Sequence, residues 1–164
     1  MKRLLLASLL AVVATTRSPA LDLATASIAD LQSAMAKGTL TSEKITELYL
    51  ARIAAYDKQG PNLNTVITAN AKVLTEAKAL DAERKAGKVR GPLHGIPIVL
   101  KDNIDTFDLP TTGGSQLLAG SIPPDDAFIV KKLRAAGAIV IAKVNLSEWA
   151  GGGGSVSGAK DPAV

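Results

Sequence analysis

The sequence predicts an α/β fold in which helices cover a sheet, and three observations support this prediction. The composition is rich in small aliphatic residues, with 47% hydrophobic residues and 3% aromatic ones. The first half of the chain follows a helical period, whereas the second half contains two short, wholly apolar runs typical of buried strands. A helix that ends at a glycine leads into the second run, as in α/β proteins. Two or three strands are too few for a self-sufficient sheet, so we expect part of a larger domain.

Helices are predicted by capping residues and by apolar residues that recur every three or four positions. The second predicted helix places five apolar residues on one face, Ile45, Leu48, Tyr49, Ile53 and Tyr56. We expect this face to be buried. The first predicted helix covers residues 28–37 after the cap Ser27, and the second is capped by Thr41 or Ser42 and ends at Gly60-Pro61. The third covers residues 71–85, and the fourth is capped by Asp125 or Asp126 and ends at Gly137.

Two apolar runs, residues 96–100 and 138–142, predict the strands. The first run contains Pro97, which has no N–H to donate to a sheet ladder, so we place it at the start of its strand or on an edge. The second run follows the glycine that ends the fourth helix. Residues 145–150 are predicted to be the start of another helix, capped by Asn145 or Ser147.

The composition excludes several kinds of site. The chain has no cysteine, which excludes a thiol nucleophile, a thiolate metal site and disulfides. It has one histidine, which excludes a metal centre built from several histidines, and we expect neither a metal nor a cofactor. The net charge of +4 comes mainly from Lys2, Arg3 and Arg17, since removal of residues 1–20 leaves 16 basic and 15 acidic residues. No clustered basic face is left, so nucleic acid is not an expected partner.

Residues 1–20 have the features of a secretory signal peptide. Lys2 and Arg3 precede an apolar run over residues 4–14, and the segment ends in a small-x-Ala sequence at Ala20. The apolar run is too short to cross a bilayer, which needs about 20 residues. The alternative is an uncleaved anchor that lies in the membrane interface. We expect cleavage near Ala20, export to the periplasm or the medium, and no membrane contact afterwards.

Lys101 is the residue whose position most suggests chemistry. It ends an apolar strand, and ligand crevices in α/β folds lie at strand ends. A lysine buried there would have a lowered pKa, because burial disfavours the charged ammonium, and its neutral amine would be available as a general base. The alternative is a structural ion pair with the neighbouring Asp102.

His94 and a loop over residues 111–115 are further candidates. His94 has no acidic neighbour in the sequence to orient it, which favours a structural role in a turn. The loop offers hydroxyls and unhindered backbone N–H groups, as a substrate or oxyanion loop does, although a plain surface turn fits equally. The glycines over residues 151–154 resemble a phosphate loop only superficially, because no strand precedes them and no helix follows. The residues of the 111–115 loop are Thr111, Thr112, Gly113, Gly114 and Ser115.

Three blocks of the sequence resemble the amidase signature family, in the family's order. Residues 91–104 resemble its lysine-bearing segment, the 111–115 loop is similar to the loop that follows, and residues 126–149 are similar to its helix–strand–Asn-x-x-Glu block. The resemblance extends from about Ile28 to Ala150. The end of the last block, with the Ser-Val-Ser-Gly sequence after it, is most similar to the secreted, peptide-amidase-like branch.

The resemblance implies an amidase-signature fold, with a helical N-terminal part and a mixed sheet covered by helices, present only in part. It also implies a hydrolase that converts a carboxamide, such as a peptide C-terminal amide, to carboxylate and ammonia without a cofactor. The family uses a Ser–cis-Ser–Lys triad, and Lys101 matches its lysine. The family's serines lie in a later Gly/Ser-rich segment, so we expect no nucleophile within this chain. Ser155 and Ser157 come too early and lack the strand and helix that should follow them.

The expected organisation is a signal peptide at residues 1–20, the N-terminal part of an amidase domain at 21–150, and a flexible Gly/Ser-rich tail at 151–164 beside a truncation. We expect the chain alone to be inactive and poorly stable. Two alternatives stay open. One is a non-catalytic remnant or binding module of the amidase fold that keeps Lys101 for structure. The other is an enzyme in which Lys101 forms a Schiff base with a carbonyl substrate.

Overall fold

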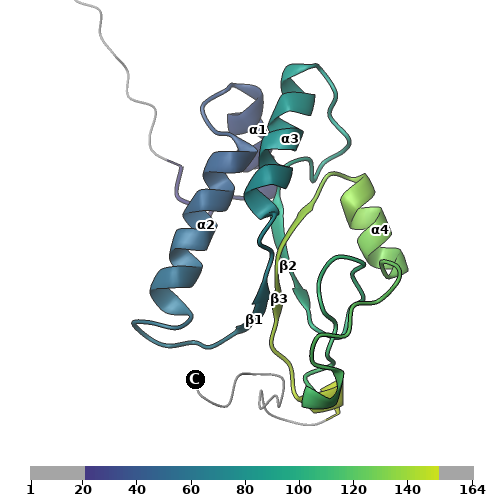
Figure 1. Ribbon diagram of the computed structural model, residues 1–164. Coiled ribbons are helices and arrows are strands. Elements are labelled where there is room, and N and C mark those ends of the chain that lie inside the picture. The colour runs from purple at the N-terminus through teal and green to yellow at the C-terminus, as the bar shows by residue number, and fades with distance from the viewer. Residues whose placement is uncertain (1–20, 152–164) are drawn as a thin grey trace, which may run out of the picture.

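The centre of the molecule is a mixed three-stranded sheet, described by a computed structural model that covers residues 21–151 (Figure 1). The strands β1 (Val66–Ala69), β2 (Pro97–Lys101) and β3 (Ile139–Val144) lie in the order β1–β3–β2. β3 runs antiparallel to β1 and parallel to β2. The predictions for residues 1–20 and 152–164, including the signal peptide, Ser155 and Ser157, lie outside the described residues.

The helices α1 (Ile28–Ala36) and α2 (Ser42–Tyr56) begin where the capping residues predict. The hydroxyl of Ser27 accepts a hydrogen bond from the N–H of Asp30, whose carboxylate accepts one from the N–H of Ser27. Thr41 caps α2 through its hydroxyl. Each cap satisfies N–H groups that the first helical turn leaves unpaired, so short polar motifs fix both helix starts.

The predicted apolar face of α2 is only partly buried. Ile45 is fully buried, and Tyr49 and Ile53 are half-buried. Leu48 and Tyr56 are exposed, so the prediction of a buried face is wrong at these two positions. Tyr56 lines an open groove beside the sheet, where no element within residues 21–151 covers the last turn of the helix.

Helices cover both faces of the sheet (Figure 1). On one face, α3 (Val73–Lys85) packs against β3, and α2 packs against α3. On the other face, α4 (Phe128–Ala135) is anchored by the fully buried Val130. Consequently β3 is buried along almost its whole length, whereas β2 lies at an edge and is partly exposed. α3 buries the three residues that the sequence predicts, Val73, Ala77 and Leu80.

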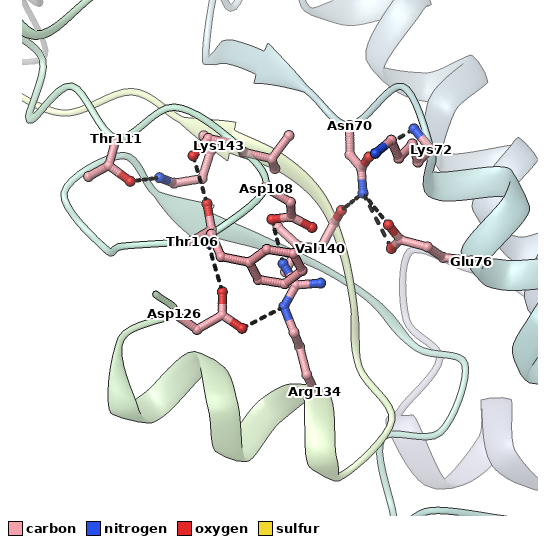
Figure 2. A network of polar contacts seen from close by, with 12 residues as sticks. Asn70, Lys72, Glu76, Thr106, Asp108, Thr111, Asp126, Arg134, Val140 and Lys143 are labelled. Carbon is pink, nitrogen blue, oxygen red and sulfur yellow. Dashed lines mark hydrogen bonds and ion pairs between the residues drawn. The ribbon is translucent and has the colours of Figure 1, made fainter. Parts of the chain in front are cut away.

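The cap predicted for α4 is wrong. Its N-cap is Ala127, which makes no side-chain capping bond. Asp126 instead accepts a hydrogen bond from the N–H of Phe107 and forms an ion pair with Arg134 (Figure 2). The carboxylate therefore ties the loop before α4 to the helix, a tertiary role that sequence spacing does not reveal. Asp125 forms an exposed ion pair with Lys131.

The strands differ from their predictions mainly at their ends. β2 and β3 begin one residue later than predicted, and β3 extends two residues further, to Val144. Pro97 is the first residue of the edge strand β2, as predicted. The sequence prediction missed β1, which has four residues. A strand this short carries too little alternation to be seen in the sequence.

The predicted start of a helix at residues 145–150 is only a single 3-10 turn within residues 21–151, η2 (Glu148–Ala150), with Ser147 at its N-cap position but without a side-chain capping bond. Trp149 in this turn has φ of +55°, outside the helical range. Its N–H donates to the carbonyl of Gly113 at 2.7 Å. This tertiary contact takes the place of a helical hydrogen bond. Within residues 21–151, no helix is long and apolar enough to cross a bilayer.

Candidate active site

Lys101 is exposed at the end of β2, so the expectation that it is buried is wrong. Within residues 21–151, its amine makes no hydrogen bond or ion pair. The alternative expectation, a structural ion pair between Lys101 and Asp102, is also wrong. Asp102 is fully buried and pairs with Lys143 on the neighbouring strand. The amine of Lys101 is therefore left available for another partner.

Lys143 is the buried lysine of this region. Its side chain is 0% exposed, and Nζ lies 3.2 Å from Oδ1 of Asp102. Nζ also donates to the carbonyl of Pro110 at 3.0 Å. It donates to the hydroxyl of Thr111 at 2.8 Å as well (Figure 2). Burial lowers the pKa of Lys143, while the nearby carboxylate of Asp102 opposes this by favouring the charged form. The ammonium is thus held by two hydrogen bonds and one ion pair, as a buried charge requires.

Asp102 ties the end of β2 to β3 and to the 111–115 loop. Its N–H donates to the carbonyl of Val144 at 2.9 Å, and its carbonyl accepts from the N–H of Gly113 at 3.0 Å. Its Oδ2 accepts from the N–H of Thr112 at 3.2 Å and from the Thr112 hydroxyl. The residue that directly follows Lys101 is therefore held through both its backbone and its side chain.

The backbone N–H groups of the 111–115 loop are all used inside the protein, so the expectation that they are free is wrong. Thr111 donates to the carbonyl of Ser121, and Thr112 and Gly113 both donate to Asp102. The remaining two donate to oxygens of Thr112. No oxyanion hole is preformed by these amides in this arrangement. A substrate-contacting role for Thr111, Thr112, Gly113, Gly114 and Ser115 stays a prediction.

Ser115 ends this loop with a buried hydroxyl that has no hydrogen-bond partner among residues 21–151. Gly113 and Gly114 have φ of +59° and +79°, a region that side chains disfavour. A Cβ on Gly113 would also meet the ring of Trp149 at 3.4 Å. The glycines therefore let the loop turn tightly beneath Trp149.

His94 has the structural role that its sequence context favours. It is fully buried, and Nε2 lies 2.9 Å from the carbonyl of Leu80 while Nδ1 accepts from the N–H of Arg90 at 3.2 Å. These bonds assign the proton to Nε2. Both ring nitrogens are used to hold the turn before β2 against α3, so His94 does not face a substrate.

An apolar groove of about 480 Å³ opens beside β2, between α2 and the sheet. Val99 lines the groove and is 52% exposed. Alternate residues of a strand share a face, so Val99 and Lys101 point to the same side of β2, and Leu100 between them is buried. The side chain of Lys101 therefore leaves β2 on the groove side of the sheet, although Lys101 does not line the groove itself. Within residues 21–151, no cluster of His, Asp and Glu could hold a metal ion.

The sequence prediction missed Lys143 and Asn70 as parts of this region. Lys143 follows an apolar run directly, and a lysine inside a buried strand needs a partner, so extending the predicted strand by one residue would have revealed it. Asn70 lies 73 positions earlier in the chain and carries no local signal. Its place beside β3 depends on the fold alone.

Comparison with known proteins identifies the family of the chain. The sequence model of the family Amidase matches residues 44–161. A Schizosaccharomyces pombe protein assigned to the amidases is 49% identical over 126 residues, which cover 76% of this chain and 21% of that protein. One component of the glutamyl-tRNA(Gln) amidotransferase of Salinispora arenicola is 42% identical over 131 residues, 80% of this chain and 26% of the relative.

Solved structures agree with this match. The peptide amidase of Stenotrophomonas maltophilia superposes with a TM-score of 0.74 at 51% identity, over 77% of this chain and 26% of that one. An amidase family protein of Bacillus anthracis superposes with a TM-score of 0.72 at 41% identity, over 76% and 25%. The chain thus spans about a quarter or less of the length of these relatives. On its sequence and its fold, the chain belongs to the amidase family.

Proposed function

We propose that this chain supplies the lysine-bearing part of an amidase that hydrolyses a carboxamide to a carboxylate and ammonia, with Lys101 as the base. The observation that carries the proposal is the state of Lys101. It lies within the family match, and its amine projects unpaired, as far as residues 21–151 show, from a strand end that Asp102 holds in place. Lys143, by contrast, is buried and paired within the protein, as a structural lysine must be.

In the proposed Ser–cis-Ser–Lys mechanism, the neutral amine of Lys101 takes a proton from a bridging serine. The bridging serine takes one in turn from a second serine, whose oxygen bonds to the amide carbon. The C–N bond then breaks, the nitrogen leaves as ammonia with the transferred proton, and water hydrolyses the acyl-serine ester to the carboxylate. We propose that both serines come from polypeptide outside residues 21–151.

The proposed substrate class is the peptide C-terminal amide, supported by the 51% identity to a peptide amidase. The proposed location is outside the cytoplasm, after cleavage of residues 1–20 near Ala20. Mass spectrometry of the exported protein should find a chain that starts close to Leu21. An intact Met1 on a cytoplasmic product would contradict the export proposal.

A chimera tests the function directly. Residues 28–150 replace the matching quarter of the Stenotrophomonas maltophilia peptide amidase, and ammonia release from a C-terminally amidated peptide is measured. We expect Lys101→Ala to lower kcat by roughly a thousandfold or more, because the serine loses its base. Lys101→Arg should be nearly as damaging, since a guanidinium cannot give up its proton. Lys131→Ala, at an exposed ion pair, is the control and should leave kcat within about twofold.

Other outcomes would overturn the proposal. More than about a tenth of the activity in Lys101→Ala would assign Lys101 a structural role. A folded chimera without activity would favour the non-catalytic remnant. Substrate that becomes covalently fixed to Lys101 by borohydride would favour the Schiff-base enzyme. We expect the 164-residue chain, assayed alone, to release no ammonia above its Lys101→Ala variant.

A further inference from the structure

A one-residue shift in β3 decides which way Lys143 points. The pairing of β3 with β2 shifts by one residue around Ile141. As a result, Ile141 and the next residue, Ala142, both contact the core cluster beneath α3. Side-chain alternation resumes one residue late, so Lys143 faces the opposite side of the sheet, toward the 111–115 loop. Without the shift, strict alternation would place Lys143 on the α3 side with Ile139 and Ile141.

Asn70 holds this irregular part of β3 in place. Its side chain is 5% exposed, and Nδ2 donates to the carbonyl of Val140 at 2.9 Å (Figure 2). Its backbone N–H donates to the carbonyl of Ile141 at 2.9 Å. Its Oδ1 accepts from the N–H of Lys72 at 2.8 Å, which fixes the orientation of the amide. Two neighbouring carbonyls of the shifted segment are thus satisfied by one residue.

The shift places Lys143 where it can join three separate points of the chain. These are the Asp102 carboxylate directly after β2 and two positions of the loop that follows, Pro110 and Thr111. We propose that Lys143 and Asn70 are positioning residues for Lys101. Asn70 keeps the shift that turns Lys143 toward Asp102, and the Lys143–Asp102 pair fixes the strand end from which Lys101 projects. This inference rests on the proposed function of Lys101.

The physical reason is that the amine of Lys101 can be positioned only through the backbone that carries it. Lys101 is bound by no partner within residues 21–151, so the position of its amine depends on its backbone. That backbone is fixed on one side by the β2–β3 ladder and on the other by Asp102. Loss of the charge partner of Asp102 would leave a buried carboxylate unpaired, which favours rearrangement of the strand end. A small displacement of a catalytic group is enough to lower kcat.

Amide hydrogen exchange on the 164-residue chain tests the positioning without relying on activity. In Lys143→Met, we expect the amides of Thr112 and Gly113, which donate to Asp102, to exchange at least tenfold faster relative to the Ala77 amide in α3. Asn70→Ala should act in the same direction, and it leaves no buried charge without a partner. Lys131→Met, which removes an exposed lysine, is the matched control and should change neither ratio.

The double variant Asp102→Asn/Lys143→Met keeps the test valid if Lys143→Met fails to fold. It removes both charges together, so no unpaired charge is buried. We expect this variant to fold. We also expect the exchange rates of the Thr112 and Gly113 amides, each divided by that of the Ala77 amide, to return at least halfway to the values of the unmodified chain on a logarithmic scale. Ratios that stay as high as those of Asn70→Ala would contradict the proposed pairing.

Kinetics in the chimera separate positioning from general stability. We expect Lys143→Met and Asn70→Ala to lower kcat at least thirtyfold and to change KM by less than about threefold. Val73→Ala, which truncates a buried residue of α3 away from the site, should lower the unfolding midpoint but leave kcat within about threefold. Unchanged exchange ratios, or a kcat in Lys143→Met equal to that of Val73→Ala, would overturn the positioning roles. Activity retained in Lys101→Ala would instead overturn the proposed function and leave the exchange result standing.

Discussion

At the scale of single residues, two lysines on neighbouring strands have opposite surroundings. Lys101 is exposed and, within residues 21–151, its amine has no polar partner, whereas the amine of Lys143 is buried and has three. A buried ammonium must be satisfied locally, so Lys143 is committed to the protein's own structure. An exposed amine keeps its hydrogen-bonding capacity for a group that approaches from outside. Burial thus assigns a structural role to Lys143 and leaves the amine of Lys101 available for another group.

The buried Lys143 predicts a dependence of stability on pH. Burial lowers its folded-state pKa below the ordinary value of 10.5, although Asp102, Asp105 and Asp108 favour the charged form. Between the lowered pKa and 10.5, the unfolded chain binds more protons than the folded protein, so the free energy of unfolding rises with pH. We therefore expect the unfolding free energy of the unmodified chain, minus that of Lys143→Met, to grow as the pH rises from the lowered pKa toward 10.5. Urea unfolding at several pH values measures it, and a falling difference would contradict the lowered pKa.

Gly137 predicts a large local effect on stability. Its φ is +91°, and an added Cβ would lie 2.5 Å from Cα of His94. We expect Gly137→Ala to lower the free energy of unfolding by about 3 kcal/mol, from backbone strain and from the clash. Gly120→Ala is the matched control, because Gly120 has φ of +77° but no atom within 4 Å of the added Cβ. It should cost about 1 kcal/mol in urea unfolding. Equal losses in both variants would show that the clash relaxes.

At the scale of elements, one carboxylate joins the end of α2 to the start of β1. Asp57 follows α2 directly, and its Oδ1 accepts from the N–H and the hydroxyl of Thr65, both at 2.6 Å, and from the N–H of Val66 at 3.1 Å. Burial alone would raise the pKa of Asp57, but these hydrogen bonds lower it below 3.8. The carboxylate of Asp57 therefore closes the loop between α2 and β1, and it holds β1 at its first residue, Val66.

Asp57→Asn should loosen this connection. We expect a loss of about 2 kcal/mol of unfolding free energy at neutral pH, because an amide cannot accept all three bonds with the strength of a carboxylate. Since the folded pKa lies below 3.8, the contribution is present above pH 3.8 and is lost as the pH falls through the folded pKa. Asp125→Asn, at an exposed ion pair, is the control and should cost less than about 0.5 kcal/mol. An Asp57→Asn variant as stable as this control would contradict the anchoring role.

At the scale of the whole molecule, the described part of the fold is open at the edge strand β2 and at the apolar groove between α2 and the sheet. β2 pairs with β3 alone among the described strands, and the groove beside it is lined by Tyr56, Leu63 and Val99, which are all exposed. A large apolar surface of this kind promotes association or binds an apolar probe.

This groove predicts binding of a fluorescent apolar dye by the 164-residue chain. We expect Val99→Lys to lower the dye fluorescence several-fold, because it places a charge in the groove at a position that is already 52% exposed. Leu117→Lys is the control, since Leu117 is 89% exposed and does not line the groove. It should leave the fluorescence nearly unchanged. Equal losses in both variants would show that the dye does not bind at the groove.

Most of the architecture was predictable because its signals are local. The capping box at Ser27, the glycine that ends α4 and the apolar run of β3 each depend on a few consecutive residues. Predictions failed where a distant residue competes for a local group. Asp126 pairs with Arg134 instead of capping α4, and the N–H of Trp149 donates to Gly113 instead of continuing a helix.

The sequence by itself determined the fold class, the position of most helices and the two longer strands, and the place of Lys101 at the end of one of them. These features follow from periodicity and capping, which act over a few residues. Only the tertiary structure decided which lysine is buried, because that depends on the one-residue shift in β3 and on Asn70, 73 positions before Lys143. It likewise decided that the amides of the 111–115 loop are occupied, since Asp102 and Ser121 reach them through folding. Hydrogen bonds between distant segments leave no periodic trace in a sequence, and they set the surroundings of the candidate site.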